Sequence, residues 1–301
     1  MNAFWQHFAD GILTGAIIAL GAIGVSLAMS ILRFANFAHA ELLTFGAYIA
    51  LIVVTMFGTV GEPIGQLSFG WTLVVAIVPA GIATALLALA IDRVVYGGLR
   101  RRNAARMTLI FASFGVGLVV RNAIHMTFGG DPEYYTRELT IAVRLFETIR
   151  VMPDQIVVLA VAVVVVVALH LFLRYSAIGL AMRATAENPD LSRINGVDVD
   201  RIVGWTWSIA AALAAMAGVF MGLTVQLRPE MGFNLLLSLF AAAILGGNGS
   251  LIGAVFGGLL VGLAENLSVM VISAGYRQAV PFVLLVVVLY VRPSGLFGAR
   301  S

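Results

Sequence analysis

The chain has 301 residues, of which 61% are hydrophobic and only 11% are charged, and its mean hydropathy is +1.02. About a quarter of the residues in soluble domains are charged, so this composition excludes an ordinary soluble protein. The sequence has no cysteine and no lysine, which excludes disulfides, thiolate metal sites, a Walker A phosphate loop and a lysine nucleophile. Its net charge of +3 comes from arginines gathered in two loops, a pattern that indicates membrane topology and not nucleic-acid binding.

Six long stretches of the sequence carry no charged side chain. They cover residues 11–32, 42–61, 63–91, 155–173, 202–227 and 231–264. A helix that crosses a bilayer needs roughly 20 apolar residues, and a charge at its centre costs at least about 2.5 kcal/mol. The sequence therefore predicts an all-α polytopic membrane protein with about eight transmembrane helices. We expect residues 1–301 to form a single transmembrane domain.

The N-terminal half predicts four transmembrane helices, over about 11–32, 42–61, 70–91 and 107–128. No arginine precedes the first of them, so it lacks the basic start of a cleavable signal peptide and we expect it to be retained. A short amphipathic connector, 33–41, joins the first two. The loop at 92–106 has five arginines against one aspartate and is expected in the cytoplasm. Arg121, inside the fourth helix, is expected to reach the far membrane interface.

The C-terminal half predicts four more helices, over about 155–173, 202–227, 251–273 and 279–291. Before them, residues 139–145 have a weak alternating pattern that indicates a small β-element outside the membrane. The longest polar segment, 174–201, is two crossings away from the basic loop and is therefore also expected in the cytoplasm. Glycine and polar residues at 246–250 predict a broken or re-entrant segment near 234–250. Because of this interruption, the sequence does not fix on which side of the membrane the C-terminus lies.

Glycines recur at a spacing of four in several of these helices. The pairs are Gly11 and Gly15, Gly218 and Gly222, Gly253 and Gly257, and Gly258 and Gly262. Small residues at this spacing allow helix backbones to approach closely in lipid, so as a set they predict a tightly packed bundle.

The polar segment 174–201 contains a short predicted helix. Asn188 can cap its start, with Pro189 at the first helical position and Asp190 at the positive end of the helix dipole, and Asn195-Gly196 is a stop signal. Leu191 and Ile194 share one face, and Arg193 is expected to face the cytosol. Asp198 or Asp200 is expected to cap the next helix. Such a helix could insert into a cleft of a partner, although an ordinary solvated loop is the commoner explanation for these residues alone.

Two further places could carry function. Asn36, His39 and Glu41 lie close together after the first helix, and an ionisable cluster in or near the membrane is a functional candidate. Interfacial anchoring, with Phe34 and Phe37 in the headgroup zone, would explain the same residues. The interrupted stretch around Asn248 is similar in kind to the broken helices of transporter substrate sites, and a plain re-entrant kink is the alternative.

The sequence offers no evidence of an enzyme or a metal site. Its four histidines, at positions 7, 39, 125 and 170, have no metal-ligand spacing. Neither a G-x-S-x-G nor a G-x-x-x-x-G-K-[ST] motif occurs. If the protein drives transport, its energy must come from an ion gradient or from another subunit, and we expect it to bind no cofactor itself.

Several segments together resemble the LivH-type permease family, the membrane subunits of bacterial branched-chain amino acid ABC importers. They are Arg33-Phe34-Ala35-Asn36-Phe37-Ala38-His39-Ala40-Glu41 with Phe45-Gly46-Ala47-Tyr48, then Arg183-Ala184-Thr185-Ala186-Glu187-Asn188-Pro189-Asp190 through Ile194-Asn195-Gly196-Val197, then Gly246-Gly247-Asn248-Gly249-Ser250 with Gly253-Ala254, and finally Arg292-Pro293-Ser294-Gly295-Leu296-Phe297-Gly298. The match covers nearly the whole chain in the family's order. Ala40 departs from the pattern, where glycine is expected, and is a small-for-small change.

The resemblance implies a permease subunit of the bacterial inner membrane that forms half of a translocation pathway. Its implied partners are a LivM-like permease, two cytoplasmic ATPases similar to LivG and LivF, which use the ATP, and a periplasmic substrate-binding protein. The implied substrates are branched-chain amino acids or related small solutes such as urea, amides or aromatic acids. The implied contacts to an ATPase come from a coupling helix and its flanks, namely Arg183, Glu187, Asn188, Pro189, Asp190, Leu191, Arg193, Ile194 and Gly196. We expect Asn36, His39, Glu41 and Asn248 near the pathway.

A secondary transporter or channel for small polar solutes is the alternative. Such proteins usually need carboxylates inside their spans to couple an ion gradient. Only Glu41 and Glu265 are candidates here, and both lie near the ends of predicted spans. A membrane enzyme is a weaker alternative still, because no acid, base and nucleophile converge.

Overall fold

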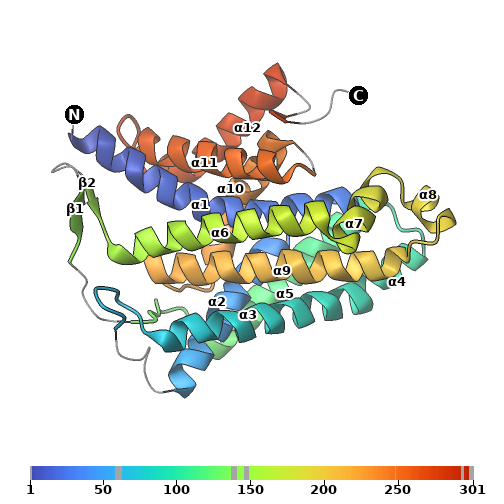
Figure 1. Cartoon of the computed structure of the whole chain (residues 1–301), viewed down its shortest axis with the longest axis horizontal. Helices are drawn as coiled ribbons and strands as arrows, with labels where there is room; N and C mark the ends of the chain where they lie inside the picture. Colours follow the sequence, from blue (N-terminus) through green and yellow to red (C-terminus); the bar gives the residue numbers. More distant parts are fainter. Residues whose placement is uncertain are drawn as a thin grey trace.

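The computed structural model describes residues 2–57, 63–136, 141–145, 149–247, 249–292 and 295–297. Figure 1 shows an elongated bundle of helices with one small pair of strands at its left-hand end. Within these described residues, eight helices are long and apolar enough to cross a membrane. The prediction of an all-α polytopic membrane protein with about eight spans is confirmed.

The spanning helices are α1 (Asn2–Leu32), α2 (His39–Met56), α3 (Trp71–Ile91), α5 (Arg106–Phe128), α6 (Pro153–Tyr175), α9 (Val199–Thr224) and α11 (Leu251–Ser268), with α12 (Val280–Val291), which spans together with the preceding turn η2 (Ala274–Ala279). The shorter elements are η1 (Asp92–Tyr96), α4 (Gly97–Arg101), β1 (Val143–Leu145), β2 (Ile149–Val151), α7 (Ala177–Glu187), α8 (Pro189–Ile194) and α10 (Met231–Gly246). The first helix is longer than expected and begins nine residues before position 11.

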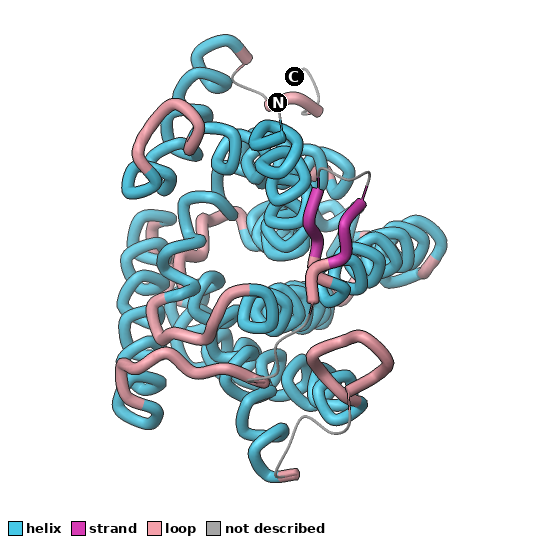
Figure 2. The backbone as a smooth tube through the Cα atoms, turned by 90° about the vertical axis from the view of Figure 1, so that its left-hand side faces the viewer, coloured by secondary structure: helices cyan, strands magenta, loops and turns pink. Residues whose placement is uncertain are grey.

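The helices divide into an inner and an outer set. Helix α1 packs against α11 and α9, and α9 in turn packs against α2 and α3. The outer helices α3, α5, α6 and α12 bury few of their side chains and expose valine, leucine and phenylalanine instead. Figure 2, which looks along the bundle, shows the helices in cross-section. An apolar outer surface of this kind suits contact with lipid or with another membrane subunit.

Glycines bring the inner helices into close contact, as their spacing predicted. A Cβ atom placed on Gly258 of α11 would lie 2.5 Å from the Cα atom of Ala19 in α1. One placed on Gly11 would lie 2.9 Å from Cα of Leu263. Because real Cβ atoms do not approach a backbone this closely, α1 and α11 can cross at this distance only through glycine.

Most of the connector between α1 and α2 is buried, although Arg33 is exposed and Phe37 is half-buried; this packing favours a buried connector over interfacial anchoring. Phe34 is 4% exposed and packs its ring against Tyr96, with 5.3 Å between the centroids. His39, the first residue of α2, packs on Gly24 in the middle of α1. The chain therefore turns back into the bundle after α1, and α2 starts inside it.

The third span does not end at Ile91, where the charges of Asp92 and Arg93 indicated a loop. It continues through the π-helical turn η1 and through α4 as far as Arg101. Asp92 is retained within this helix because Arg100 donates two hydrogen bonds to its carboxylate, at 2.7 and 2.9 Å. A paired carboxylate can be accommodated where an isolated one would end the span.

The predicted interruption in the last third lies between α10 and α11, at 247–250. Helix α10 is itself continuous, and its 16 residues extend about 24 Å, less than a full crossing. Gly247 and Gly249 have φ angles of +97° and +83°, which glycine adopts without strain. The amide of Gly249 donates to Oγ of Ser26 in α1, at 3.1 Å, and the side chain of Ser250 caps α11. The break is thus held against α1.

The two arginine-rich segments lie at the same end of the bundle, at the right in Figure 1, where α4 and α8 are labelled. We expect both segments to be cytoplasmic and, on that expectation, call this the cytoplasmic end. The amide of Leu296 donates to the carbonyl of Leu245, at 2.7 Å, so the described C-terminal residues lie beside the turn that follows α10. Since that turn packs against the last part of α1, the C-terminal segment is at the cytoplasmic end.

The strands β1 and β2 form an antiparallel pair at the opposite end, with Arg144 opposite Arg150. The predicted β-element is confirmed over 143–145, whereas Leu139 and Thr140 lie outside the described residues.

Candidate functional site

The most prominent feature of the cytoplasmic end is a helical handle made of α7 and α8. The Asn188 side chain accepts hydrogen bonds from the amides of Asp190 and Leu191, at 3.1 and 3.0 Å, and so caps α8. The helix ends at Ile194, and Gly196 follows with a φ angle of +84°. Both boundaries are as the sequence predicted.

Helix α8 presents its apolar side chains to solvent. Leu191 is 55% exposed and Ile194 is 83% exposed. Between them Arg193 forms an exposed ion pair with Asp190, with 3.4 Å between nitrogen and oxygen. Two large apolar side chains beside a charged pair, on a helix that projects from the bundle, are the features of a docking surface.

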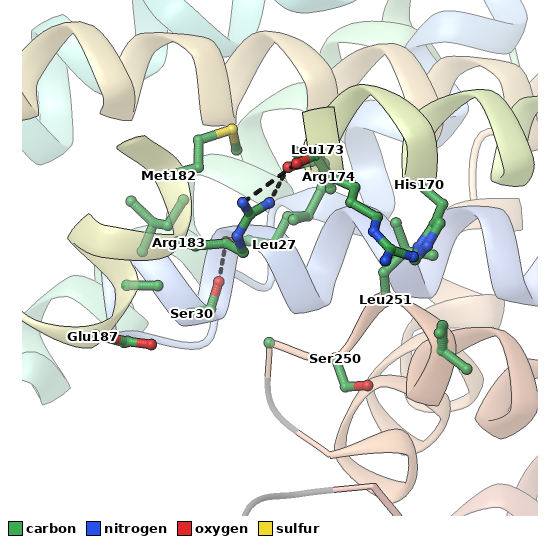
Figure 3. Close-up of a pocket in the computed structure, with 14 residues that line it drawn as sticks. Leu27, Ser30, His170, Leu173, Arg174, Met182, Arg183, Glu187, Ser250 and Leu251 are labelled. Carbon is green, nitrogen blue, oxygen red and sulfur yellow. Dashed lines mark hydrogen bonds between the residues drawn. The ribbon is translucent and has the colours of Figure 1, made fainter. Parts of the chain in front are cut away.

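The handle is anchored on the bundle by α7. Met182 and Thr185 are buried on its inner face. Arg183 does not point away from the bundle: its guanidinium group donates to the backbone carbonyl of Leu173 at the end of α6 (Figure 3). A cation at a helix C-terminus is favourable, so Arg183 braces the α6–α7 corner. Of the predicted contact residues, Pro189 is half-buried and the rest are exposed, namely Arg183, Glu187, Asn188, Asp190, Leu191, Arg193, Ile194 and Gly196.

Arg33 connects the handle to the buried connector. Its guanidinium group donates to the carbonyls of Ala186 and Glu187, at 3.4 and 3.1 Å, at the point where α7 meets α8. Arg33 itself has a φ angle of +60°, which is uncommon for a residue with a side chain. The structure therefore joins the base of the handle directly to the start of the α1–α2 connector.

The connector leads from Arg33 into a buried polar cluster. The side-chain oxygen of Asn36 accepts from the hydroxyl of Tyr96, at 3.1 Å, and from the amide of Ala38. The amide of Phe37 donates to Oγ of Ser113 in α5, at 3.0 Å. His39 is 1% exposed, and its ring nitrogens have no hydrogen-bonding partner among the described residues. The hydrogen bonds made by Asn36 and Phe37 hold the connector in a defined conformation.

Glu41 and Arg121 form an ion pair inside the bundle. The carboxylate of Glu41 accepts from Nε and Nη2 of Arg121, at 3.0 and 2.5 Å. The guanidinium carbon of Arg121 also lies 4.1 Å from the ring centroid of Phe233 in α10. The expectation that Arg121 reaches the far interface is therefore wrong, because an intramembrane arginine gains more from a buried carboxylate. The pair joins α2 to α5, and Phe233 brings α10 against it.

The structure brings Asn36, His39 and Glu41 to one place but buries all three within this chain. Glu41 alone is connected to the surface, through Arg121, whose side chain is 22% exposed. Asn248, the fourth residue expected near the pathway, lies outside the described residues. In the described part of the chain, no three histidine or carboxylate groups are placed to hold a metal ion.

Sequence reasoning missed three residues of this site. Arg121 is the one charged residue within the predicted fourth span, and Glu41, 80 residues earlier, is a carboxylate near another predicted span, so pairing the two charges would have found the ion pair. Tyr96 and Arg33 left no such signal, because Tyr96 binds a neutral side chain and Arg33 binds backbone carbonyls.

In the described part of the chain, a bundle of eight apolar helices with a helical handle projecting from one end defines a polytopic membrane protein. Residues 8–289 match the family model described as branched-chain amino acid transport system, permease component. The chain belongs to this family and is a permease component of an ABC transport system. It is a multi-pass membrane protein homologous to permeases of the bacterial inner membrane.

Curated relatives match nearly the whole chain. It is 33% identical to the high-affinity branched-chain amino acid transport system permease protein LivH of Escherichia coli (strain K12), covering 98% of this chain and 96% of the relative. It is 32% identical, with the same coverage, to the corresponding permease protein BraD of Pseudomonas aeruginosa. Among solved structures it is similar to PsaBC from Streptococcus pneumoniae in complex with Fab, with a TM-score of 0.51 at 13% identity over 97% of this chain and 92% of that one. That likeness concerns the fold alone.

Proposed function

We propose that this chain forms half of the translocation pathway of an ATP-driven importer for branched-chain amino acids. The branched-chain amino acid transport named for the relatives, which are about a third identical over almost the full length, supports this substrate class. The family match over 8–289 supports treating residues 1–301 as one transmembrane domain. The partners would be a second permease subunit, two cytoplasmic ATPases and a periplasmic substrate-binding protein.

In this proposal α8 is the coupling helix. Leu191 and Ile194 would enter a cleft of the ATPase, and Arg193 and Asp190 would supply the polar contacts. The single observation that carries the assignment is the exposure of these side chains on a capped helix at the cytoplasmic end. A rigid, short helix can transmit movement of a docked partner without deforming.

The connection through Arg33 suggests how movement of the handle would reach the pathway. When the ATPases close on ATP, the handle would shift, and the hydrogen bonds from Arg33 to the end of α7 would carry the shift to the α1–α2 connector. Because α2 begins at that connector, the Glu41–Arg121 pair and α5 would follow. The bundle would thereby exchange outward-open and inward-open arrangements of the two permease subunits.

The coupling assignment is tested by Arg193→Glu. We expect the variant to insert normally but to lose ATPase subunits when the complex is purified, because a cation at the docking surface is replaced by an anion. Arg101→Glu, an equally drastic change at an exposed arginine of the same end, should leave the complex intact. Co-purification of the ATPases measures both. Normal assembly and normal uptake by Arg193→Glu would show that α8 is not the coupling helix.

A further inference from the structure

A second feature of the cytoplasmic end is a cavity behind the handle. It has a volume of about 660 Å³ and lies between the last turns of α1 and α6, the helix α7 and the α10–α11 turn. Figure 3 shows its lining residues, among them His170 and Arg174 from α6, Arg183 from α7 and Ser250 before α11. The hydrogen bond from Arg183 to the carbonyl of Leu173, described above for the handle, borders this space.

The cavity is cationic and its charge is not neutralised from within. Arg174 and His170 both extend toward Leu251 at the start of α11 (Figure 3). In the described part of the chain, neither the guanidinium group of Arg174 nor the imidazole of His170 takes part in a hydrogen bond or an ion pair, and the guanidinium carbon of Arg174 lies 5.5 Å from the ring centroid of Tyr175. Arg183 adds a second guanidinium group. The one acidic lining residue, Glu187, lies at the opposite end of the cavity.

The first turn of α11 adds to this positive potential. Leu251 and Ile252 line the cavity, and they begin an 18-residue helix whose N-terminus carries the positive end of its dipole. Ser30 of α1 and Ser250 also line the cavity; the hydroxyl of Ser30 donates to the carbonyl of Leu27, and that of Ser250 accepts from the amide of Gly253. Guanidinium groups, hydroxyls and a helix N-terminus together are the donor set that recognises a phosphate group.

Apolar side chains connect this cationic cavity with the lipid-facing surface. Leu27, Ile31, Leu173 and Ile252 belong to its lining. The two helices that flank it expose Leu171 and Phe172 on α6, and Phe256 on α11. A ligand with a phosphate head and hydrocarbon chains could therefore place its head among the arginines while its chains remain along α6 and α11. Anionic lipids of the cytoplasmic leaflet bind basic pockets between helices in this way.

We propose that this cavity binds the phosphate group of an anionic glycerophospholipid from the cytoplasmic leaflet. Arg174 and His170 supply the free donors, and Arg183 and the start of α11 supply further positive charge. The bound lipid would join α6 and α7 to the α10–α11 turn and so stiffen the base of the handle. Phosphate supplied by a soluble anion shares the same chemistry and is distinguished by the experiment.

The experiment uses the whole transporter complex in nanodiscs of phosphatidylcholine with or without phosphatidylglycerol. Native mass spectrometry then counts the phosphatidylglycerol molecules that the complex retains. The double variant Arg174→Gln/His170→Gln should retain this lipid about tenfold more weakly, because it loses charge-assisted hydrogen bonds. Arg102→Gln, which removes an exposed arginine at the same end but outside the cavity, should behave as wild type. Arg174→Lys, which keeps the charge, should retain most of the binding.

Three results would overturn the proposal. The first is equal lipid retention by the wild type and the double variant. The second is displacement of the lipid by inorganic phosphate at the concentration at which phosphate binds to the complex in pure phosphatidylcholine, which would assign the cavity to a soluble anion. The third is protection of the cavity residues from chemical labelling in an assembled complex that retains no lipid. This result would mean that a protein subunit covers the cavity.

Discussion

The Glu41–Arg121 ion pair makes the sharpest prediction for single residues. Glu41→Gln leaves the guanidinium group of Arg121 without its counter-ion and should lower the stability of the folded protein by about 3 kcal/mol. Adding Arg121→Met removes the uncompensated charge, so the double variant should be more stable than Glu41→Gln alone. The temperature at which the purified complex aggregates measures both effects. If the two changes were simply additive, the residues would not act as a pair.

Arg33 offers a test of transmission that is separate from docking. Arg33→Asn removes the two hydrogen bonds to the end of α7, while asparagine tolerates the φ angle of +60° better than most residues. We expect the ATPases to remain bound and to hydrolyse ATP, but substrate uptake per ATP hydrolysed to fall severalfold. Uptake and hydrolysis measured in the same proteoliposomes give that ratio. An unchanged ratio would exclude Arg33 from the coupling route.

At the scale of helices, the α1–α11 crossing depends on glycine. Gly258→Ala would place a Cβ atom 2.5 Å from Cα of Ala19, so the two helices must separate, at a cost of about 1–3 kcal/mol. Gly115→Ala in α5 is the matched control, because no atom lies within 4 Å of the new methyl group. It should be neutral or slightly stabilising. The temperature of thermal aggregation measures the stability of both variants. An equal loss of stability in the two variants would contradict this account.

The helices were predictable from the sequence because lipid excludes charge and the longest apolar runs correspond to spans. The handle was predictable as well, since Asn188 and Gly196 mark its ends locally. The inward turn of the α1–α2 connector was not predictable. Its phenylalanines are compatible with an interface, and only packing of His39 on Gly24 shows that the chain turns inward there. The third span was predicted to end before Asp92, because the sequence does not show that Asp92 pairs with Arg100 on the same continuing helix.

At the scale of the whole molecule, the two ends of the bundle differ. The cytoplasmic end carries the basic segments, the handle and the cationic cavity, whereas the other end carries the β1–β2 pair. The buried connector and the Glu41–Arg121 pair lie between the handle and the remaining bundle. In the proposed mechanism, movement of the bundle is driven by force that the ATPase subunits apply to the handle.

The most direct test of this account is solute accumulation by defined preparations. Proteoliposomes that contain the chain with its second permease, both ATPases and the binding protein should accumulate a branched-chain amino acid against a gradient only when ATP is supplied. The same chain without the ATPases should accumulate none. Uphill uptake by the chain alone, or uptake by the full complex driven by an ion gradient without ATP, would contradict the account.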